Sequence, residues 1–243
     1  MPTTSDSNRD RESAKQFFDG LRDHLSCKIS LTDVQQWIQK KKEGLAPDSK
    51  GVQYEGLFID KFVLPEIPEY LEKALDLSAA DRCTAFLAES GLAKTRGWTS
   101  NSPASANKYL FTKIFGVDSK NVVKSWWGDS KKGLTYQSCP DWAFRDPCPH
   151  TVIFEGKFFR KGGIDAARRE LVSGIYQCFY YLAHPYSPPV GKHPAWDYEY
   201  ACLFAYDASA NGSFVEAWAT LNNRVKQACW DTANIFVIVL PEK

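Results

Sequence analysis

The segment from Thr151 to Phe159, TVIFEGKFF, constrains the fold of this chain more than any other. β-Branched and aromatic residues dominate it, as they do in strands that are largely buried. Glu155 and Lys157 stand two positions apart within the run, so both side chains project from the same face of the strand. Charged groups in such surroundings are costly unless they are paired or bind a metal ion. The segment therefore predicts a buried strand that presents an acid and a lysine together.

Hydrophobic periodicity predicts the elements around this strand. Apolar residues at helical spacing predict helices over Ser13–Leu25, Leu31–Lys42, Pro68–Leu77, Ala79–Gly91, Ile164–Ala183 and Ser213–Trp230. β-Rich segments predict further strands over Val122–Trp127, Gly133–Gln137, Tyr198–Tyr206 and Ile235–Leu240. From residue 122 onward the order is β-β-β-α-β-α-β, which predicts an α/β fold with a mixed central sheet flanked by helices.

The first hundred residues contain only predicted helices, and a stretch rich in Ser, Asn and Pro follows them over Trp98–Ala106. We expect one compact body with a soft boundary at this stretch. Residues 1–106 would form a helical N-terminal region with a DNA-recognition or structural role. Residues 107–243 would form the core that contains the sheet.

Charge and hydropathy limit the classes of function. The chain has 30 basic and 29 acidic residues, so contacts with nucleic acid must use local patches rather than net charge. The opening segment has no apolar signal region, and no later run approaches the ~18 apolar residues of a membrane span. We therefore expect a soluble, intracellular (cytoplasmic) protein that does not bind membranes.

The cysteines argue against a zinc site. The chain has 7 of them, scattered and without close CxxC pairs, so we expect reduced and mostly buried thiols. Cys139, Cys148 and His150 lie close together in the sequence, but no fourth ligand is evident and their spacing matches no common zinc pattern.

Asp141 follows Pro140 and the predicted strand Gly133–Gln137. A connection through Arg145–Pro149 and a return along Thr151–Phe159 would bring Asp141 beside Glu155. Two carboxylates and the Lys157 ammonium would then converge on one site.

Pro140-Asp141, followed by Glu155-Gly156-Lys157, resembles the motif of the PD-(D/E)xK nuclease superfamily, which includes many restriction and repair endonucleases. The resemblance covers roughly residues 122–240. It implies a restriction-endonuclease-like core and Mg²⁺-dependent cleavage of DNA.

Two further features of that superfamily have counterparts here. Gln177 and Tyr181, four apart on the predicted helix, resemble the Gln-x-x-x-Tyr element of a branch that includes helicase-associated nucleases. The initial helix of the family often supplies a further acid, for which Glu55 and Glu89 are both candidates.

The implied chemistry accounts for these residue types. Hydrolysis of a phosphodiester requires neutralisation of charge on the phosphate and a hydroxide near neutral pH, and a hard divalent cation held by carboxylates provides both. Asp141 and Glu155 would hold Mg²⁺, for which Mn²⁺ could substitute. Lys157 would stabilise the hydroxide or help to remove its proton. Gln177 is the candidate that orients the site.

Plain structural roles remain open for the same residues. Glu155 and Lys157 could be an ion pair at a sheet edge, and Asp141 a turn residue after proline. Gln177 could be a surface glutamine. The tripeptides that begin at Asp48, Asp118 and Asp129 also match D-x-K, but they lie among Ser, Gly and Lys and are typical of solvated turns.

Basic residues gather around the start of the helix after the strand: Arg160, Lys161, Arg168 and Arg169. They are candidates for contacts with phosphates next to the scissile one, and a solvated charged face is the alternative. The expected function is a Mg²⁺-dependent endonuclease that cuts double-stranded DNA, as a restriction or defence enzyme and with a homodimer as one expected assembly. The alternatives are a repair or recombination nuclease acting on ends or single strands, with Trp126, Trp127 and Trp142 as stacking surfaces, or an inactive binding protein of the same fold.

Overall fold

A mixed five-stranded sheet lies at the centre of the part of the chain that the computed structural model describes, namely residues 4–43, 54–78, 86–88, 141–144, 147–183 and 198–241. Its strands follow one another in the order β1 (Phe86–Ala88), β2 (Trp142–Phe144), β3 (Val152–Phe159), β4 (Tyr200–Asp207) and β5 (Ile235–Leu240). The expected α/β class with a mixed sheet is confirmed.

The strand direction changes at β3. β3, β4 and β5 run parallel to one another, whereas β1 is antiparallel to β2 and β2 is antiparallel to β3. β3 pairs with β4 along its whole length, but β2 pairs only with residues 152–154 of β3. From residue 155 onward, one edge of β3 thus has no strand partner among the described residues.

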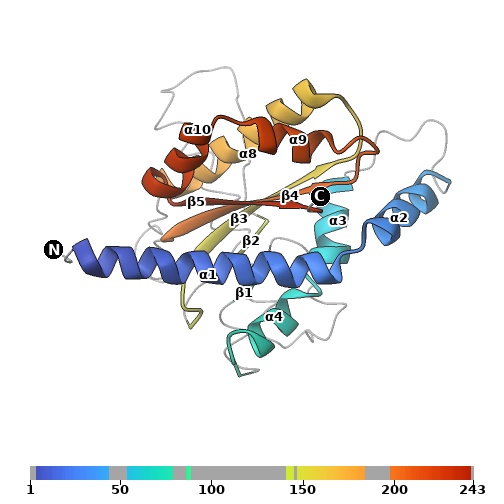
Figure 1. Cartoon of the computed structure of the whole chain (residues 1–243). Helices are drawn as coiled ribbons and strands as arrows, with labels where there is room; N and C mark the ends of the chain where they lie inside the picture. The colour runs from blue at the N-terminus through green and yellow to red at the C-terminus, as the bar shows by residue number, and fades with distance from the viewer. Residues whose placement is uncertain are drawn as a thin grey trace, which may run out of the picture.

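Helices cover both faces of the sheet (Figure 1). On one face lie α1 (Thr4–Lys28), α2 (Leu31–Glu43), α3 (Tyr54–Phe58), the π-helical turn η1 (Ile59–Val63) and α4 (Ile67–Lys73). On the other face lie α8 (Ile164–Ala183) and α9 (Ser213–Thr220), and α10 (Asn223–Gln227) and the π-helical turn η4 (Ala228–Thr232) lead from α9 into β5. The result is a layered molecule with the sheet in the middle.

Alternation along β4 divides the core into two hydrophobic clusters. Cys202, Phe204 and Tyr206 pack with residues of α1 to α4, whereas Leu203 and Ala205 pack with residues of α8 and α9. This separation follows from the two-residue period of a strand, which sends successive side chains to opposite faces. In β4, even-numbered residues therefore face α1 to α4 and odd-numbered residues face α8 and α9.

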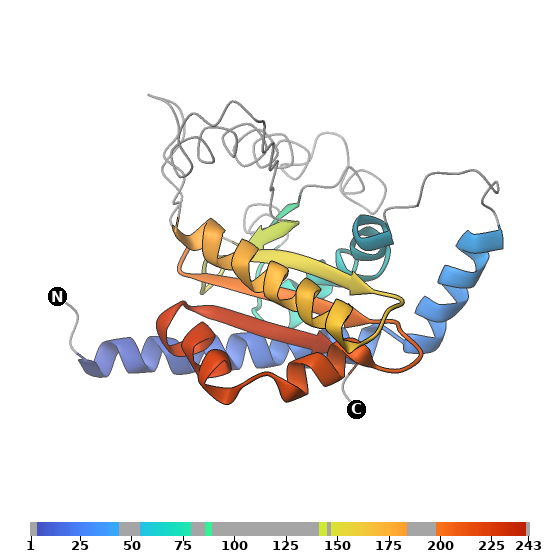
Figure 2. The same cartoon turned by 90° about the horizontal axis from the view of Figure 1, so that it is seen from above.

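α8 is the crossover that joins the parallel strands β3 and β4, and it lies across both of them (Figure 2). Its buried positions Ala167, Leu171 and Cys178 follow helical spacing. A side chain at Gly174 would lie 2.5 Å from Leu203 of β4, so glycine allows the helix to approach the sheet closely. The predicted bounds Ile164–Ala183 are confirmed.

Most of the other predicted elements that fall on described residues are confirmed, with two exceptions. The predicted helix Ala79–Gly91 is wrong at 86–88, where the chain forms β1. The predicted helix Ser213–Trp230 is interrupted after Thr220, because Leu221 is extended and Asn222 starts a new helix by capping the Arg224 N–H. The predicted strands Val122–Trp127 and Gly133–Gln137 lie outside the described residues.

The helical N-terminal region and the sheet share a core. Phe18 of α1 stacks on Phe236 of β5, with ring centroids 4.6 Å apart, and β1 adds a strand to the sheet. The boundary predicted at residue 106 lies outside the described residues and stays a prediction. Among the described helices, none combines the length and the apolar character needed to cross a membrane.

Candidate active site

Glu155 and Lys157 lie in the middle of β3 and are buried, with 4% and 8% of their surfaces exposed. Both point to the face covered by α8, as their spacing predicts. The Lys157 Nζ donates to Glu155 Oε1 at 2.6 Å, so the ion pair that the spacing also allows does form. Further acids lie around the same lysine, and the pair is one part of a larger cluster.

Asp141 stands directly before β2 and is held against β3 by two hydrogen bonds. Its backbone N–H donates to the Phe154 carbonyl at 3.0 Å, and its Oδ2 accepts from the Gly156 N–H at 2.6 Å. Because Phe154 and Gly156 flank Glu155, these two hydrogen bonds place Asp141 beside Glu155, as predicted. A side chain at Gly156 would lie 2.3 Å from Ile59 and 3.1 Å from the Asp141 carboxylate, so this position requires glycine.

Glu55 of α3 is the third carboxylate of the cluster. Its Oε1 lies 3.6 Å from Lys157 Nζ, and its Oε2 accepts from the Phe158 N–H at 3.4 Å. Of the two acids considered from sequence, the structure therefore brings Glu55 to Lys157, while Glu89 lies outside the described residues. Asp141 and Glu55 occupy the N–H groups on the edge of β3 that β2 leaves unpaired.

The charges of the cluster shift the pKa of its members. Burial raises the pKa of Asp141 well above its ordinary value, and the nearby Glu155 carboxylate raises it further. Burial also raises the pKa of Glu55, against the opposing effect of Lys157. Burial lowers the pKa of Lys157, but Glu155, Glu55 and Asp141 together outweigh it, so its net pKa is raised and it remains an ammonium.

α8 contributes Tyr181 to the site. The buried Tyr181 hydroxyl donates to Glu155 Oε2 at 2.8 Å, so both oxygens of Glu155 have a partner. Gln177, the residue singled out from the sequence, is half-buried one turn earlier, and its side chain has no hydrogen-bond partner among the described residues. The sequence signal for Tyr181 was its four-residue spacing from Gln177 in the Gln-x-x-x-Tyr element.

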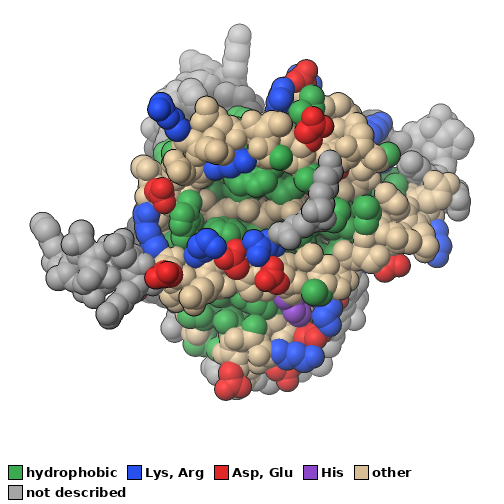
Figure 3. All heavy atoms as spheres, in the orientation of Figure 1, with side chains coloured by type: hydrophobic (Ala, Val, Ile, Leu, Met, Phe, Trp, Pro, Cys, Tyr) green, Lys and Arg blue, Asp and Glu red, His purple; other side chains and the backbone are tan. Residues whose placement is uncertain are grey.

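The four basic residues predicted to contact nucleic acid have different local surroundings. Arg160 follows β3 and lies over the Tyr54 ring, with its guanidinium carbon 3.7 Å from the ring centroid. Arg168 forms an ion pair with Asp165 at 3.2 Å, and Lys161 and Arg169 are exposed. Basic and acidic side chains are interspersed on the face shown in Figure 3.

One of the predicted stacking surfaces for single strands is wrong. Trp142 is 0% exposed and stacks on Phe154, with ring centroids 4.7 Å apart, because it belongs to β2 inside the core. Trp126 and Trp127 lie outside the described residues.

The donor set of the cluster consists of carboxylate oxygens, which suit hard cations such as Mg²⁺. Among the described residues, no three His, Cys, Asp or Glu side chains are arranged closely enough to bind a metal ion by themselves. Mg²⁺ in proteins often takes only one or two carboxylates and completes its shell with water and substrate phosphate. At this buried edge Asp141 and Glu155 supply two carboxylates.

The group Cys139, Cys148 and His150, considered above as a partial zinc site, includes a residue with a structural role. His150 Nε2 lies 3.1 Å from the Ser13 hydroxyl, which joins α1 to the segment before β3. Cys148 is a buried free thiol, and Cys139 lies outside the described residues.

Comparison of the chain with known proteins gave no match to a protein-family profile, a curated protein or a solved structure.

Proposed function

We propose that this chain is a Mg²⁺-dependent endonuclease that hydrolyses double-stranded DNA, with a core of the PD-(D/E)xK, restriction-endonuclease-like type. One observation carries the proposal. Asp141, Glu155 and Glu55 surround Lys157 at the edge of β3 where β2 stops pairing. A purely structural ion pair would need one acid, whereas this lysine lies among three.

Each residue of the cluster has its own role in the proposed reaction. Asp141 and Glu155 would hold the cation, while Glu55 pairs with Lys157. When bound, Mg²⁺ would neutralise charge on the scissile phosphate and lower the pKa of a water molecule. Lys157 keeps its positive charge and would stabilise the negative charge that develops around the phosphorus. Tyr181 fixes the orientation of Glu155 through its hydroxyl.

Two features of the fold support the same proposal. The order of the strands and the crossover by α8 agree with the core implied by the sequence motif. Asp141 lies directly before β2, Glu155 on β3 and Glu55 on the adjacent helix α3, so rigid elements position these acids. A restriction or defence role, a cytoplasmic location and a homodimer remain the expected biological setting.

The test measures cleavage of supercoiled plasmid by the parent and by Asp141→Asn, Glu155→Gln and Lys157→Met. Each variant removes one charge at nearly constant shape, and each should lower the rate a hundredfold or more, as is typical when a metal ligand or charge stabiliser is lost. Glu216→Gln removes an exposed carboxylate far from the cluster in sequence and serves as the matched control. Parental rates in all three site variants would overturn the proposal.

The metal is tested with the same DNA at fixed salt in EDTA, Mg²⁺, Mn²⁺ and Ca²⁺. We expect cutting with Mg²⁺ and Mn²⁺, and binding without cutting with Ca²⁺, because the larger ion accepts looser coordination and polarises water less. Full cutting in EDTA would contradict a metal mechanism. Preference for linear or single-stranded DNA over closed plasmid would favour the repair or recombination alternative, and binding without cutting in every metal would favour an inactive member of the fold.

A further inference from the structure

Large apolar side chains lie exposed along α8, the long helix on the outside of one helix layer (Figure 2). Val172 is 58% exposed, Tyr176 49% and Phe179 47%. Their spacing, i, i+4 and i+7, places them on one stripe of the helix. Single exposed apolar residues are ordinary on soluble proteins, whereas contiguous apolar patches mark interaction sites. The stripe therefore indicates a surface that binds another molecule.

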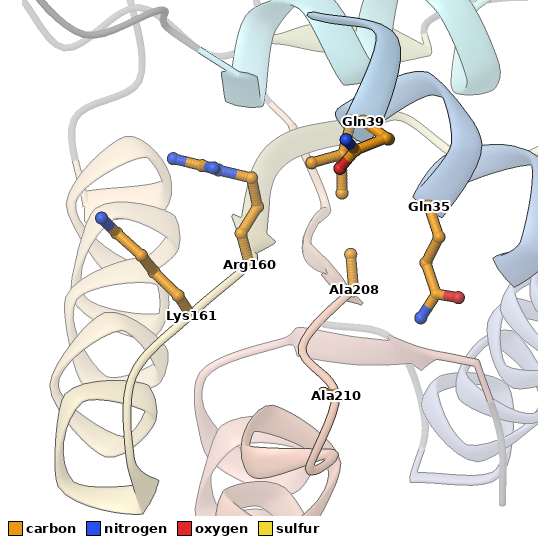
Figure 4. A pocket seen from close by; sticks show the side chains of 7 residues that line it. Gln35, Gln39, Arg160, Lys161, Ala208 and Ala210 are labelled. Atoms are coloured by element: carbon orange, nitrogen blue, oxygen red, sulfur yellow. The ribbon is translucent and has the colours of Figure 1, made fainter. Parts of the chain in front are cut away.

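The pocket that α2 forms with the ends of β3 and β4 is a weaker candidate for a binding surface (Figure 4). Its volume is about 390 Å³, but the charged ends of Arg160 and Lys161 point away from the glutamines Gln35 and Gln39 of α2. The polar groups of the pocket thus do not converge on one ligand. The three apolar side chains of the α8 stripe, in contrast, lie on one side of one helix.

The charges of α8 are confined to its first two turns, where four residues carry them: Asp165, Arg168, Arg169 and Glu170. The rest of the helix, Leu171–Ala183, has no charged residue. Its last turn therefore has no basic side chain to compensate the partial negative charge of the carbonyl groups at the C-terminal end. A molecule that fits this helix needs an apolar stripe opposite the uncharged part and a positive charge beyond it.

A second copy of α8, packed antiparallel about a two-fold axis beside Tyr176, has both features. Val172 of each copy then lies opposite Phe179 of the other, so a small side chain meets a large one. Arg169 lies seven residues before Tyr176, and Ala183 lies seven residues after it. Arg169 of each copy therefore comes to the last turn of the other α8, where a cation is favoured. A parallel arrangement would instead place like charges side by side.

The other side of α8 holds residues of the acid cluster in place. The Tyr181 hydroxyl donates to Glu155 Oε2 at 2.8 Å. A side chain at Gly174 would lie 3.3 Å from Lys157 Cγ, so the backbone of the helix passes close to this lysine. Packing against a second copy would restrict the movement of α8 and would thereby fix the position of Tyr181.

We propose that this protein forms a homodimer through Val172, Tyr176 and Phe179, with the α8 helices of the two copies antiparallel. One helix pair makes a small interface, so we expect a dissociation constant on the order of 1–10 µM. The dimer steadies the helix that carries Tyr181 and thereby supports DNA cleavage. This effect on cleavage rests on the proposed nuclease function, whereas the dimer itself does not.

Sedimentation velocity of the full-length protein, at up to about 100 µM, measures the association. Each substitution in a two-fold interface acts twice, so Tyr176→Glu and Phe179→Glu should each weaken the association roughly tenfold or more. Gln16→Glu adds the same charge at an exposed position of α1, on the opposite face of the sheet, and should leave the association unchanged. A parent that stays monomeric, or equal association of all four proteins, would overturn the proposal.

Disulfide trapping tests the antiparallel geometry without any loss of association. In a Cys27→Ser background, which removes an exposed thiol, Tyr176→Cys should give a covalent dimer on mild oxidation, because this position lies beside the two-fold axis. Asp165→Cys is exposed on the same helix but far from the axis, so it should remain monomeric. Covalent dimers from both variants alike would indicate parallel helices and would contradict the proposal.

Cleavage of supercoiled plasmid, at a protein concentration near the dissociation constant, tests the link to the acid cluster. The two α8 glutamate variants should cut about threefold more slowly than the parent, part of the roughly 10–100-fold effect of losing a residue that orients a metal ligand. Their circular dichroism spectra should be unchanged, because both substituted side chains are exposed. Parental rates from monomeric variants would disprove the link between dimer and site. No cleavage by any of the proteins, with the sedimentation difference intact, would instead remove the nuclease function and leave the dimer established.

Discussion

Lys157 sits in a buried strand only because acids surround it. A lone ammonium in such a position would lose its hydration without compensation, and its pKa would fall. Glu155 and Glu55 reverse that effect and raise the pKa of Lys157. Removing Glu155 or Glu55, the acids closest to Lys157, leaves its buried charge poorly compensated.

Tyr181→Phe should lower the rate of DNA cleavage by roughly 10–100-fold, the usual cost of losing a residue that orients a metal ligand. The ring stays in place and only the hydroxyl bonded to Glu155 is lost. Gln177→Ala, one turn earlier on α8, should cause a smaller loss. Measuring kcat and KM separately checks the role, because a positioning residue changes kcat more than KM. Equal rates for Tyr181→Phe and the parent would assign Tyr181 to packing.

Asp141→Asn should keep the hydrogen bond from the Gly156 N–H and remove a charge that burial disfavours. In EDTA its thermal midpoint should equal or exceed that of the parent. The raised pKa of Asp141 means that the folded state binds a proton more tightly than the unfolded chain, so the parent loses stability as pH rises through that pKa. Mg²⁺ should raise the midpoint of the parent but not of the variant.

Differential scanning fluorimetry across pH, with and without Mg²⁺, provides the measurement. Asp231→Asn, at an exposed carboxylate, is the control for loss of one charge. A midpoint several degrees below that of the parent in EDTA would mean that the Asp141 carboxylate stabilises the metal-free fold.

The sequence was sufficient to predict Asp141, Glu155 and Lys157 as neighbours, because their order along the chain and the apolar flanks of β3 depend on local pattern. It could not select between Glu55 and Glu89, since the acid comes from a short helix whose contact with β3 is set by tertiary packing. The sequence also could not show whether Gln177 or Tyr181 reaches Glu155, because that depends on how α8 is rotated about its own axis when it packs on the sheet.

At the level of elements, α9 depends on a carboxylate outside the helix. Asp207, at the end of β4, is buried and accepts from the Phe214 N–H at 2.7 Å, from the Val215 N–H at 3.1 Å and from the Ser209 N–H at 2.9 Å. These bonds satisfy N–H groups in the first turn of α9 that have no partner within the helix. The Asp207 side chain therefore fixes both the start of α9 and the turn that follows β4.

Asp207→Ala should destabilise the fold by about 2 kcal/mol or more, because buried N–H groups lose a charged acceptor. In a protein of this length, about 2 kcal/mol corresponds to a fall in thermal midpoint of roughly 4–8 °C. Glu216→Ala, exposed in the same first turn, tests the effect of charge alone and should cost under about 1 kcal/mol. Similar midpoints for the two variants would contradict a capping role for Asp207.

Long periodic elements were predictable from the sequence and short ones were not. α8 and the strands β3, β4 and β5 carry enough residues for their periods to be recognised. β2 has three residues and α3 has five, too few to establish a pattern. Both owe their form to neighbours: β2 to its pairing with β3, and α3 to the packing of Phe58 in the core.

At the scale of the whole molecule, α1 joins the ends of the chain. Phe18 is 0% exposed and contacts Tyr200 of β4, Trp230 of η4 and Phe236 of β5. The N-terminal helix thus completes the core beneath the last strands. We expect the described helices and the sheet to unfold together.

Phe18→Ala should lower the free energy of unfolding by about 3–5 kcal/mol, the usual cost of truncating a buried phenylalanine. The transition should remain single, with the same midpoint by circular dichroism and by tryptophan fluorescence. Gln16→Ala, exposed on the same helix, is the control and should have little effect. Two separate transitions would show that the N-terminal region folds independently of the sheet.

The early end of β2 has a consequence beyond chemistry. Unpaired strand edges invite pairing with the edge of another molecule, and proteins usually cover or charge such edges. Here the carboxylates of Asp141 and Glu55 accept from the Gly156 and Phe158 N–H groups, which have no strand partner among the described residues. The acids proposed for catalysis thus also cap this part of the β3 edge, and substitution of both by alanine should leave two N–H groups on which a second copy could add a strand.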